Sequence, residues 1–244
     1  MIVILIQPQR LIQYFEWALE GSGGGYSKIR PMTEFPAVQP RSCINSSRLH
    51  GVRATVCVKP GDTAISATVL ATGAWEPELV TNVLRALALY PEATLVDIGC
   101  NIGMFTVMAA ALGHRVVAVD TMADNLAYVH TSLAADGREG RVTLVHSSVS
   151  NDRQLKLYPV LDDFEAANPG ATRLVTVDTV IYSKMKALGP PTPSILLPDL
   201  FSSVKSSTLI VKMDIEGWEC KALLVPGVFH TGKFIPYIFM EWKF

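Results

Sequence analysis

The clearest pattern in the chain is a series of short apolar runs that alternate with segments of helical hydrophobic spacing. Five such runs occupy residues 94–98, 115–119, 142–146, 209–213 and 237–240. Short, continuously apolar runs are typical of strands that are buried on both faces, as in a parallel sheet covered by helices. The pattern therefore predicts an α/β fold of the Rossmann-like type, with a mostly parallel twisted sheet and helices on both faces.

The residues that precede the first of these runs are predicted to pack on the outside of that fold. Residues 54–58 and 64–70 are rich in β-branched side chains and flank Pro60, Gly61 and Asp62, which predicts a β-hairpin. Residues 76–89 have apolar side chains at helical spacing, with Pro77 near the start, where a missing N–H costs little. We expect residues 51–90 to pack on a core domain formed by residues 91–244.

The N-terminal segment, residues 1–50, is expected to be peripheral and partly flexible. Residues 11–19 could form a short amphipathic helix, and the glycine-rich run at 21–25 is typical of a flexible joint. The apolar start at 1–6 is far shorter than the roughly 20 residues that span a bilayer. Since it also makes a poor signal peptide, we expect a cytoplasmic protein without a membrane span.

A long insertion separates the third and fourth apolar runs. Residues 154–158 and 173–177 predict an antiparallel detour, and residues 188–200 contain four prolines, Pro190, Pro191, Pro193 and Pro198. Because proline disfavours helix interiors and central strands, we expect an exposed loop here that borders a substrate pocket. The chain stops at Phe244, directly after the fifth run, so the C-terminal strands of such a sheet are expected to be missing.

Composition and charge narrow the possible functions. The chain has 49% hydrophobic and 18% charged residues, which suits one sizeable core, and its formal net charge of -1 leaves no basic surplus for binding nucleic acid. The four cysteines, Cys43, Cys57, Cys100 and Cys220, are widely separated. This spacing predicts neither a disulfide framework nor a zinc site, and no other metal site is assigned.

The strongest candidate for ligand binding is the turn that follows the first run. Val96-Asp97-Ile98-Gly99-Cys100-Asn101-Ile102-Gly103 leads from a buried strand into an apolar helix. In open α/β sheets, ligands bind at such carboxyl ends of strands. A dinucleotide fingerprint requires glycine where this chain has Asn101 and Met104, so a pyrophosphate is disfavoured.

S-adenosyl-L-methionine fits the same turn better. It has no phosphate and carries two positive charges, so the carboxylate of Asp97 favours it, and its carboxylate can meet a helix N-terminus. Asp120 follows the second run, a little over twenty residues past the glycine turn, where an acidic side chain takes ribose hydroxyls. We therefore expect the following residues to bind this cofactor: Asp97, Gly99, Cys100, Asn101, Gly103, Phe105, Asp120, Ser148 and Glu76.

A second group of charged residues lies at the end of the fourth run. Strand alternation puts Lys212, Asp214 and Glu216 on one side, where three charges are unfavourable unless they are paired or functional. Asp214 or Glu216 is a candidate general base, with Lys212 holding their charge or a developing alkoxide. Two other interpretations remain open, a purely structural ion-pair network and a divalent cation held with Asp178.

Together the two motifs resemble the FkbM-type methyltransferase family. The resemblance rests on Val96 to Gly103 and on Lys212-Met213-Asp214-Ile215-Glu216-Gly217-Trp218-Glu219, and it extends over roughly residues 94–242. It implies a class I methyltransferase fold and methyl transfer from S-adenosyl-L-methionine to a hydroxyl oxygen of a small molecule or glycan. The alternatives are a non-catalytic Rossmann-like binding module and a nicotinamide oxidoreductase.

Overall fold

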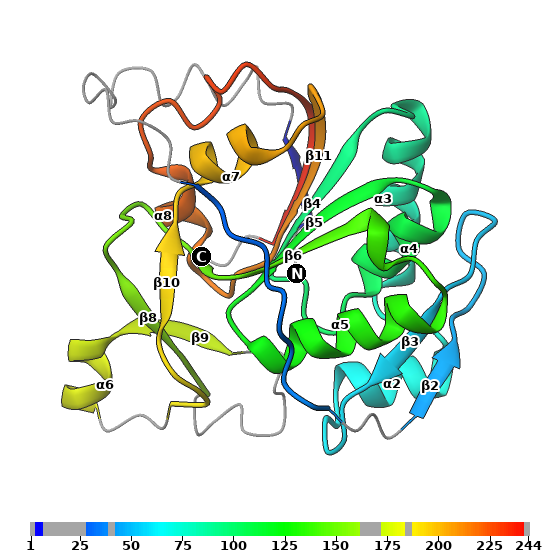
Figure 1. Ribbon diagram of the computed structural model, residues 1–244, viewed down its shortest axis with the longest axis horizontal. Coiled ribbons are helices and arrows are strands. Elements are labelled where there is room, and N and C mark those ends of the chain that lie inside the picture. Colours follow the sequence, from blue (N-terminus) through cyan, green and yellow to red (C-terminus); the bar gives the residue numbers. More distant parts are fainter. Residues whose placement is uncertain (1–2, 7–27, 39–41, 162–171, 184–186, 242–244) are drawn as a thin grey trace.

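The structure, a computed structural model, describes residues 3–6, 28–38, 42–161, 172–183 and 187–241 (Figure 1). The helix expected at 11–19 and the glycine-rich joint at 21–25 lie outside these residues. None of the helices in the described ranges has the length and apolar character that crossing a membrane requires.

A six-stranded sheet forms the centre of the molecule, in the order β1-β12-β11-β4-β5-β6. Its strands are β1 (Val3–Ile6), β4 (Thr94–Ile98), β5 (Arg115–Asp120), β6 (Val142–His146), β11 (Thr208–Met213) and β12 (Phe234–Glu241). The five strands from β12 to β6 are parallel, which confirms the parallel sheet that the five apolar runs predicted. Beyond β12 the sheet continues with β1, which pairs antiparallel and comes from the segment expected to be peripheral.

Helices cover the two faces of this sheet, as the apolar strands require. The helices α3 (Pro77–Leu89), α4 (Met104–Leu112) and α5 (Ala123–Ala135) lie on one face, and α7 (Leu197–Ser203) and α8 (Glu219–Leu223) lie on the other (Figure 1). Alternation along β4 supplies both cores, because Leu95 packs into the first and Val96 and Ile98 into the second. The predicted helix at 76–89 is confirmed, with Pro77 in its first turn.

The predicted hairpin around Pro60 is wrong. The true hairpin joins β2 (Ser42–Asn45) to β3 (Thr55–Val58), and the expected strand at 64–70 is the helix α2 (Ile65–Thr72). Asp62 stabilises the first turn of α2, since its carboxylate accepts hydrogen bonds from the backbone N–H groups of Ala64 and Ser66, at 3.0 and 2.8 Å. These hydrogen bonds favour the start of a helix in a segment whose β-branched composition had suggested a strand.

The prediction that the cysteines form no disulfide is also wrong, because Cys43 and Cys57 are bonded. They face each other directly across the β2–β3 hairpin, so antiparallel register closes a separation that spacing alone did not reveal. The sequence interpretation missed the pair because it placed the partner of β3 after that strand instead of before it. Cys100 and Cys220 are free.

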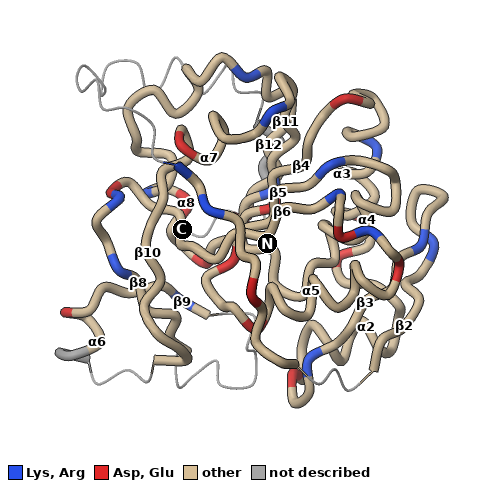
Figure 2. Tube along the Cα trace, viewed as in Figure 1, with Lys and Arg blue, Asp and Glu red and all other residues tan. Residues whose placement is uncertain are grey.

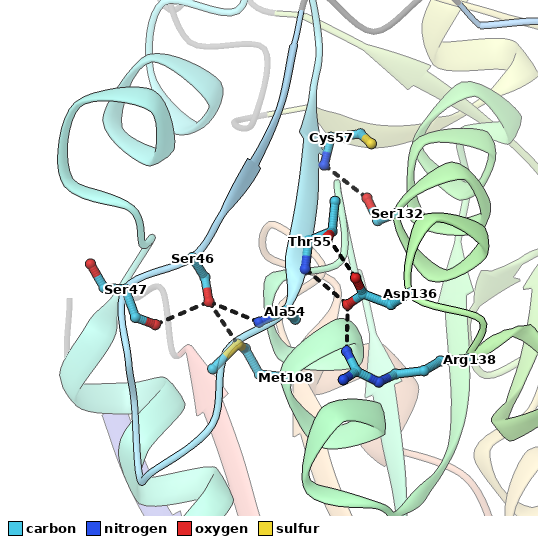
Figure 3. A network of polar contacts seen from close by, with 9 residues as sticks. All are labelled: Ser46, Ser47, Ala54, Thr55, Cys57, Met108, Ser132, Asp136 and Arg138. Atoms are coloured by element: carbon cyan, nitrogen blue, oxygen red, sulfur yellow. Dashed lines mark hydrogen bonds and ion pairs between the residues drawn. The ribbon is translucent and has the colours of Figure 1, made fainter.

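Polar contacts hold this hairpin against α5 (Figure 3). The backbone N–H of Cys57 donates to the Ser132 hydroxyl at 2.9 Å, and Thr55 donates its N–H and its hydroxyl to the Asp136 carboxylate, at 2.9 and 2.6 Å. Arg138 forms an ion pair with the same carboxylate. The hairpin is therefore a fixed part of the face that α3, α4 and α5 cover.

The insertion between β6 and β11 forms a second sheet, in the order β7-β10-β8-β9. Its strands are β7 (Ser148–Val149), β8 (Lys156–Val160), β9 (Arg173–Thr176) and β10 (Thr192–Ile195), and the short helix α6 (Val177–Ser183) follows β9. The antiparallel pairing of β8 with β9 confirms the predicted detour. The insertion is thus a folded unit beside the end of the main sheet.

The proline-rich segment is only in part the exposed loop that we expected. Residues 188–191, with Pro190 and Pro191, are irregular and partly exposed, whereas the rest forms β10, which lies between β7 and β8, and the largely buried helix α7. β10 pairs with β8 through Thr192 and Pro193 and with β7 through Ser194 and Ile195. Pro193 is the last residue of β10 that pairs with β8, and the strand pairs with β7 from the next residue on, so the missing N–H of Pro193 is tolerated. Pro198 falls in the first turn of α7, where a missing N–H also costs little.

Candidate functional site

A cavity opens at the carboxyl ends of β4, β5 and β11, where an open α/β sheet binds its ligands. Its volume is about 260 Å³, close to the lower end of the range for small-molecule sites, about 300–1,000 Å³. Most of the residues expected to form the site line it. These are Glu76, Gly99, Cys100, Asn101, Phe105, Asp120, Lys212, Asp214 and Glu216.

Close packing against the loop after β11 shapes the glycine turn after β4. Gly99 has a φ of +75°, and a Cβ on it would lie 1.7 Å from the carbonyl oxygen of Asp214. The backbone N–H groups of Gly99 and Cys100 donate to the Val119 carbonyl, at 2.8 and 3.1 Å, which ties the turn to β5. Only glycine allows this contact, so the two predicted motifs form one piece of structure.

Gly103 has a different role from the one we expected. It precedes α4 with a φ of +85°, and a Cβ on it would lie 2.6 Å from Cγ2 of Val129 on α5. Gly103 does not line the cavity and instead permits close packing of α4 against α5. Met104 and Phe105, in the first turn of α4, line the cavity, and Gly103 offers no side chain to cap the first N–H groups, which lack partners within the helix.

Asp120 lines the cavity at the end of β5, but most of its hydrogen-bonding capacity is used. It accepts hydrogen bonds from the backbone N–H groups of Asn101 and Met122, both at 2.8 Å, and from the Asn125 amide at 3.2 Å. An ionised carboxylate has about four acceptor positions, so one remains for a ligand. Burial raises the pKa of Asp120, while the three donors act in the opposite direction.

Asp97 lies beneath the cavity and does not line it. The side chain is fully buried, accepts a hydrogen bond from the Thr106 hydroxyl at 2.6 Å, and has no hydrogen-bond donor at its Oδ1 atom. Burial raises its pKa, although Lys212 and Thr106 act in the opposite direction. Asp97 therefore contributes to the charge balance of the site without lining the cavity.

Lys212 connects the two motifs from below the cavity. Its Nζ atom donates to the Gly99 carbonyl oxygen at 2.8 Å and lies 3.7 Å from Asp97 and 3.9 Å from Asp214. Burial acts to lower the pKa of Lys212, but attraction to Asp214 and Asp97 outweighs it and raises the pKa above its ordinary value. The surroundings of Lys212 therefore favour its charged form, and its contacts suit a structural ion-pair network as well as a catalytic group.

Three carboxylates gather at the edge of the cavity. One oxygen atom from each of Asp214, Glu216 and Glu241 lies within 4.8 Å of the others, which is an arrangement that could hold a divalent cation. The sequence interpretation had named Asp178 as the third member, but Asp178 is exposed on α6 and belongs to neither the cluster nor the cavity. Glu241 ends β12, and only its position after a predicted strand could have indicated it.

Ser148 does not belong to the cavity either. It is buried in the second sheet, where its hydroxyl hydrogen-bonds to the Thr192 hydroxyl at 2.5 Å. The preceding residue, Ser147, lines the cavity instead and donates its hydroxyl to the Pro193 carbonyl at 2.8 Å. We expected Ser148 to face the cavity, but its place in the short strand β7 turns it into the second sheet, and Ser147 faces the cavity instead.

Other lining residues escaped the sequence interpretation because they come from segments without a motif. Thr172 and Leu174 reach the cavity from the insertion, and Ile65 reaches it from α2. The position of these residues depends on how the peripheral elements pack on the core, and no spacing of residues in the sequence reveals it. Burial raises the pKa of the Cys100 thiol, so this residue is a wall of the cavity and not a nucleophile.

The charged groups around the cavity are predominantly acidic. Within the described part of the chain, five carboxylates line it, those of Glu76, Asp120, Asp214, Glu216 and Glu241, against one ammonium, that of Lys212. Figure 2 shows acidic positions in the middle of the view, around the marker of the C-terminus. The cavity therefore favours a cationic ligand and opposes a pyrophosphate.

No protein-family model matches the chain, and neither does any curated protein.

Proposed function

We propose that this chain is an S-adenosyl-L-methionine-dependent methyltransferase that acts on a hydroxyl oxygen of a small molecule or glycan. The observation that carries the proposal is the acidic cavity at the carboxyl ends of β4, β5 and β11, with five carboxylates and one ammonium around it. This charge balance suits a sulfonium and an ammonium and disfavours the pyrophosphate of a nicotinamide cofactor.

The residues present fit this cofactor in three respects. The uncapped N-terminus of α4 offers N–H groups to a carboxylate, Asp120 retains one acceptor position for a ribose hydroxyl, and the acidic rim complements positive charge. When bound, the cofactor supplies an activated methyl group with a good leaving group. The protein then has to orient the acceptor and remove its proton.

Asp214 is the general base that the geometry supports best. Its carboxylate lines the cavity, is 29% exposed, and lies 3.9 Å from the Lys212 ammonium, so it is placed to accept a proton from a bound hydroxyl. Glu216 and Glu241 stand beside it and can orient a hydroxyl of the acceptor. Lys212 holds the Gly99 carbonyl and the Asp214 carboxylate in one arrangement, as a positioning residue.

Calorimetric titration tests the cofactor assignment directly. The chain should bind S-adenosylhomocysteine, while NAD should give no heat of binding under the same conditions. Binding of NAD without S-adenosylhomocysteine would replace the proposal with an oxidoreductase, and binding of neither would leave a non-catalytic module. Adding EDTA or Mg²⁺ to the titration separates a metal-dependent site at the three carboxylates from a metal-free one.

Asp214→Asn tests the catalytic assignment. This variant should retain affinity for S-adenosylhomocysteine but lose about 10²- to 10⁴-fold in methyl transfer to alcohols or monosaccharides, because general base catalysis contributes that much. Transfer is measured by mass spectrometry as the gain of a methyl group. Asp178→Asn removes an exposed carboxylate outside the cavity and should transfer at the wild-type rate. An unchanged rate in Asp214→Asn would remove this residue from the mechanism.

A further inference from the structure

A second cavity lies at the opposite end of the main sheet, where β4, β5 and β6 begin. It has a volume of about 780 Å³, which is within the range of small-molecule sites, about 300–1,000 Å³. Its walls are the segment at 29–31, the starts of the three strands, and the loop at 203–207 that follows α7. None of the proposed methyltransferase residues contributes to it.

The charged residues of this second cavity have the opposite sign from those of the first. Arg115, Arg141 and Lys205 line it and are exposed, whereas among the residues that the structure describes Glu92 is the one carboxylate in its wall. Figure 2 shows several basic positions in the upper half of the view, around the labels of β4, β5 and β11. In a chain with a formal net charge of -1, this is a local concentration of positive charge.

These cations are available to a ligand. Within the residues that the structure describes, none of the three forms an ion pair with a carboxylate. Arg141 donates one guanidinium N–H to the Gly113 carbonyl at 2.7 Å, which anchors the group at the cavity and leaves its other donors for a ligand. A cation held in place before binding loses less freedom when it meets an anion.

We propose that this second cavity binds a small phosphate-type anion. Guanidinium groups recognise phosphate oxygens through paired, charge-assisted hydrogen bonds, and Arg115 and Arg141 supply two of them. Lys205 adds a compact positive charge on the facing loop. A site in a cavity with three cations favours a small anion over a nucleic acid, which needs an extended basic surface. This inference does not depend on the methyltransferase proposal.

Titration of the full chain with inorganic pyrophosphate at low ionic strength tests the proposal, with orthophosphate in a parallel titration. We expect saturable binding of pyrophosphate, with weaker binding of orthophosphate because it offers fewer oxygens and less charge. The double variant Arg115→Gln, Arg141→Gln should weaken pyrophosphate binding about tenfold for each guanidinium removed. Arg48→Gln, on the β2–β3 hairpin, removes an exposed arginine outside the cavity and should bind as the wild type does.

Both remaining outcomes overturn the proposal. Equal binding by the wild type and the double variant would mean that pyrophosphate binds elsewhere, and no binding by the wild type would mean that the cavity is not an anion site. Thermal unfolding of each variant without ligand should match the wild type, because all three substituted side chains are exposed. S-adenosylhomocysteine affinity should also be unchanged in the double variant, which separates this test from that of the methyltransferase site.

Discussion

Substitution of Gly99 by alanine is the sharpest test of how the candidate site is built. The residue has a φ of +75°, and the new Cβ would lie 1.7 Å from the Asp214 carbonyl oxygen and 2.9 Å from its carbonyl carbon. The left-handed backbone costs an alanine about 1–2 kcal/mol. Moving the two backbone segments apart adds about 1–3 kcal/mol, the usual cost of overpacking. We therefore expect Gly99→Ala to lower the free energy of unfolding by about 2–5 kcal/mol.

Gly61 provides a matched control, because its φ is +78° and a Cβ there would meet nothing within 4 Å. Gly61→Ala should therefore lose only the backbone contribution, about 1–2 kcal/mol. Urea denaturation gives both free energies, and titration with S-adenosylhomocysteine shows whether Gly99→Ala also displaces the carboxylate of Asp214. Equal destabilisation by the two variants, with unchanged ligand affinity, would refute the contact between the turn and the loop after β11.

Three further predictions concern the disulfide, the hairpin contacts and Lys212. Cys43→Ser should lower the free energy of unfolding, measured by urea denaturation, by about 3 kcal/mol. The wild type in dithiothreitol should be as unstable as this variant, and equal stability with and without the disulfide would contradict the prediction. Asp136→Ala removes both acceptors of Thr55 and should cost about 1–3 kcal/mol in the same assay, whereas the exposed Asp178→Ala should cost almost nothing. Lys212→Met leaves Asp97 without its cation and should cost about 3–5 kcal/mol near neutral pH.

The Lys212 variant also has a defined pH dependence. Because the folded-state pKa of Lys212 is raised above its ordinary value of 10.5, its contribution is fully present below pH 10.5 and is lost as the pH rises through the folded-state pKa. The stability difference between the wild type and Lys212→Met should therefore narrow above pH 10.5. Lys212→Arg keeps the charge and should show less loss at neutral pH. A difference that stays constant to high pH would contradict the ion-pair explanation.

The sequence predicted the parallel sheet because its strands are buried on both faces and so are marked by continuous apolar runs. It failed where local composition conflicted with longer-range contacts. The segment at 64–70 is rich in β-branched residues but follows Asp62, whose carboxylate caps a helix. The prolines at 190–198 suggested a loop, yet a strand whose pairing changes side accommodates Pro193.

The candidate site was predictable to the extent that its residues follow strands. Nine of the twelve expected residues line the cavity, because the carboxyl ends of parallel strands meet at one edge. Asp97, Gly103 and Ser148 do not, and each is used in burial or packing that alternation cannot reveal. Thr172 and Leu174 were missed because the insertion approaches the cavity through tertiary packing alone, whereas Glu241 ends a parallel strand and could have been expected at this edge.

The bond between Cys43 and Cys57 has a practical consequence for how the protein is made. Disulfides persist in oxidising compartments and are rare in the reducing cytosol, so the conditions of production decide whether Cys43 and Cys57 are bonded in a sample. Material from an ordinary bacterial cytosol would carry two thiols at this position and would rely on Ser132 and Asp136 to hold the strands. Periplasmic or secretory expression is the appropriate source for every measurement described above.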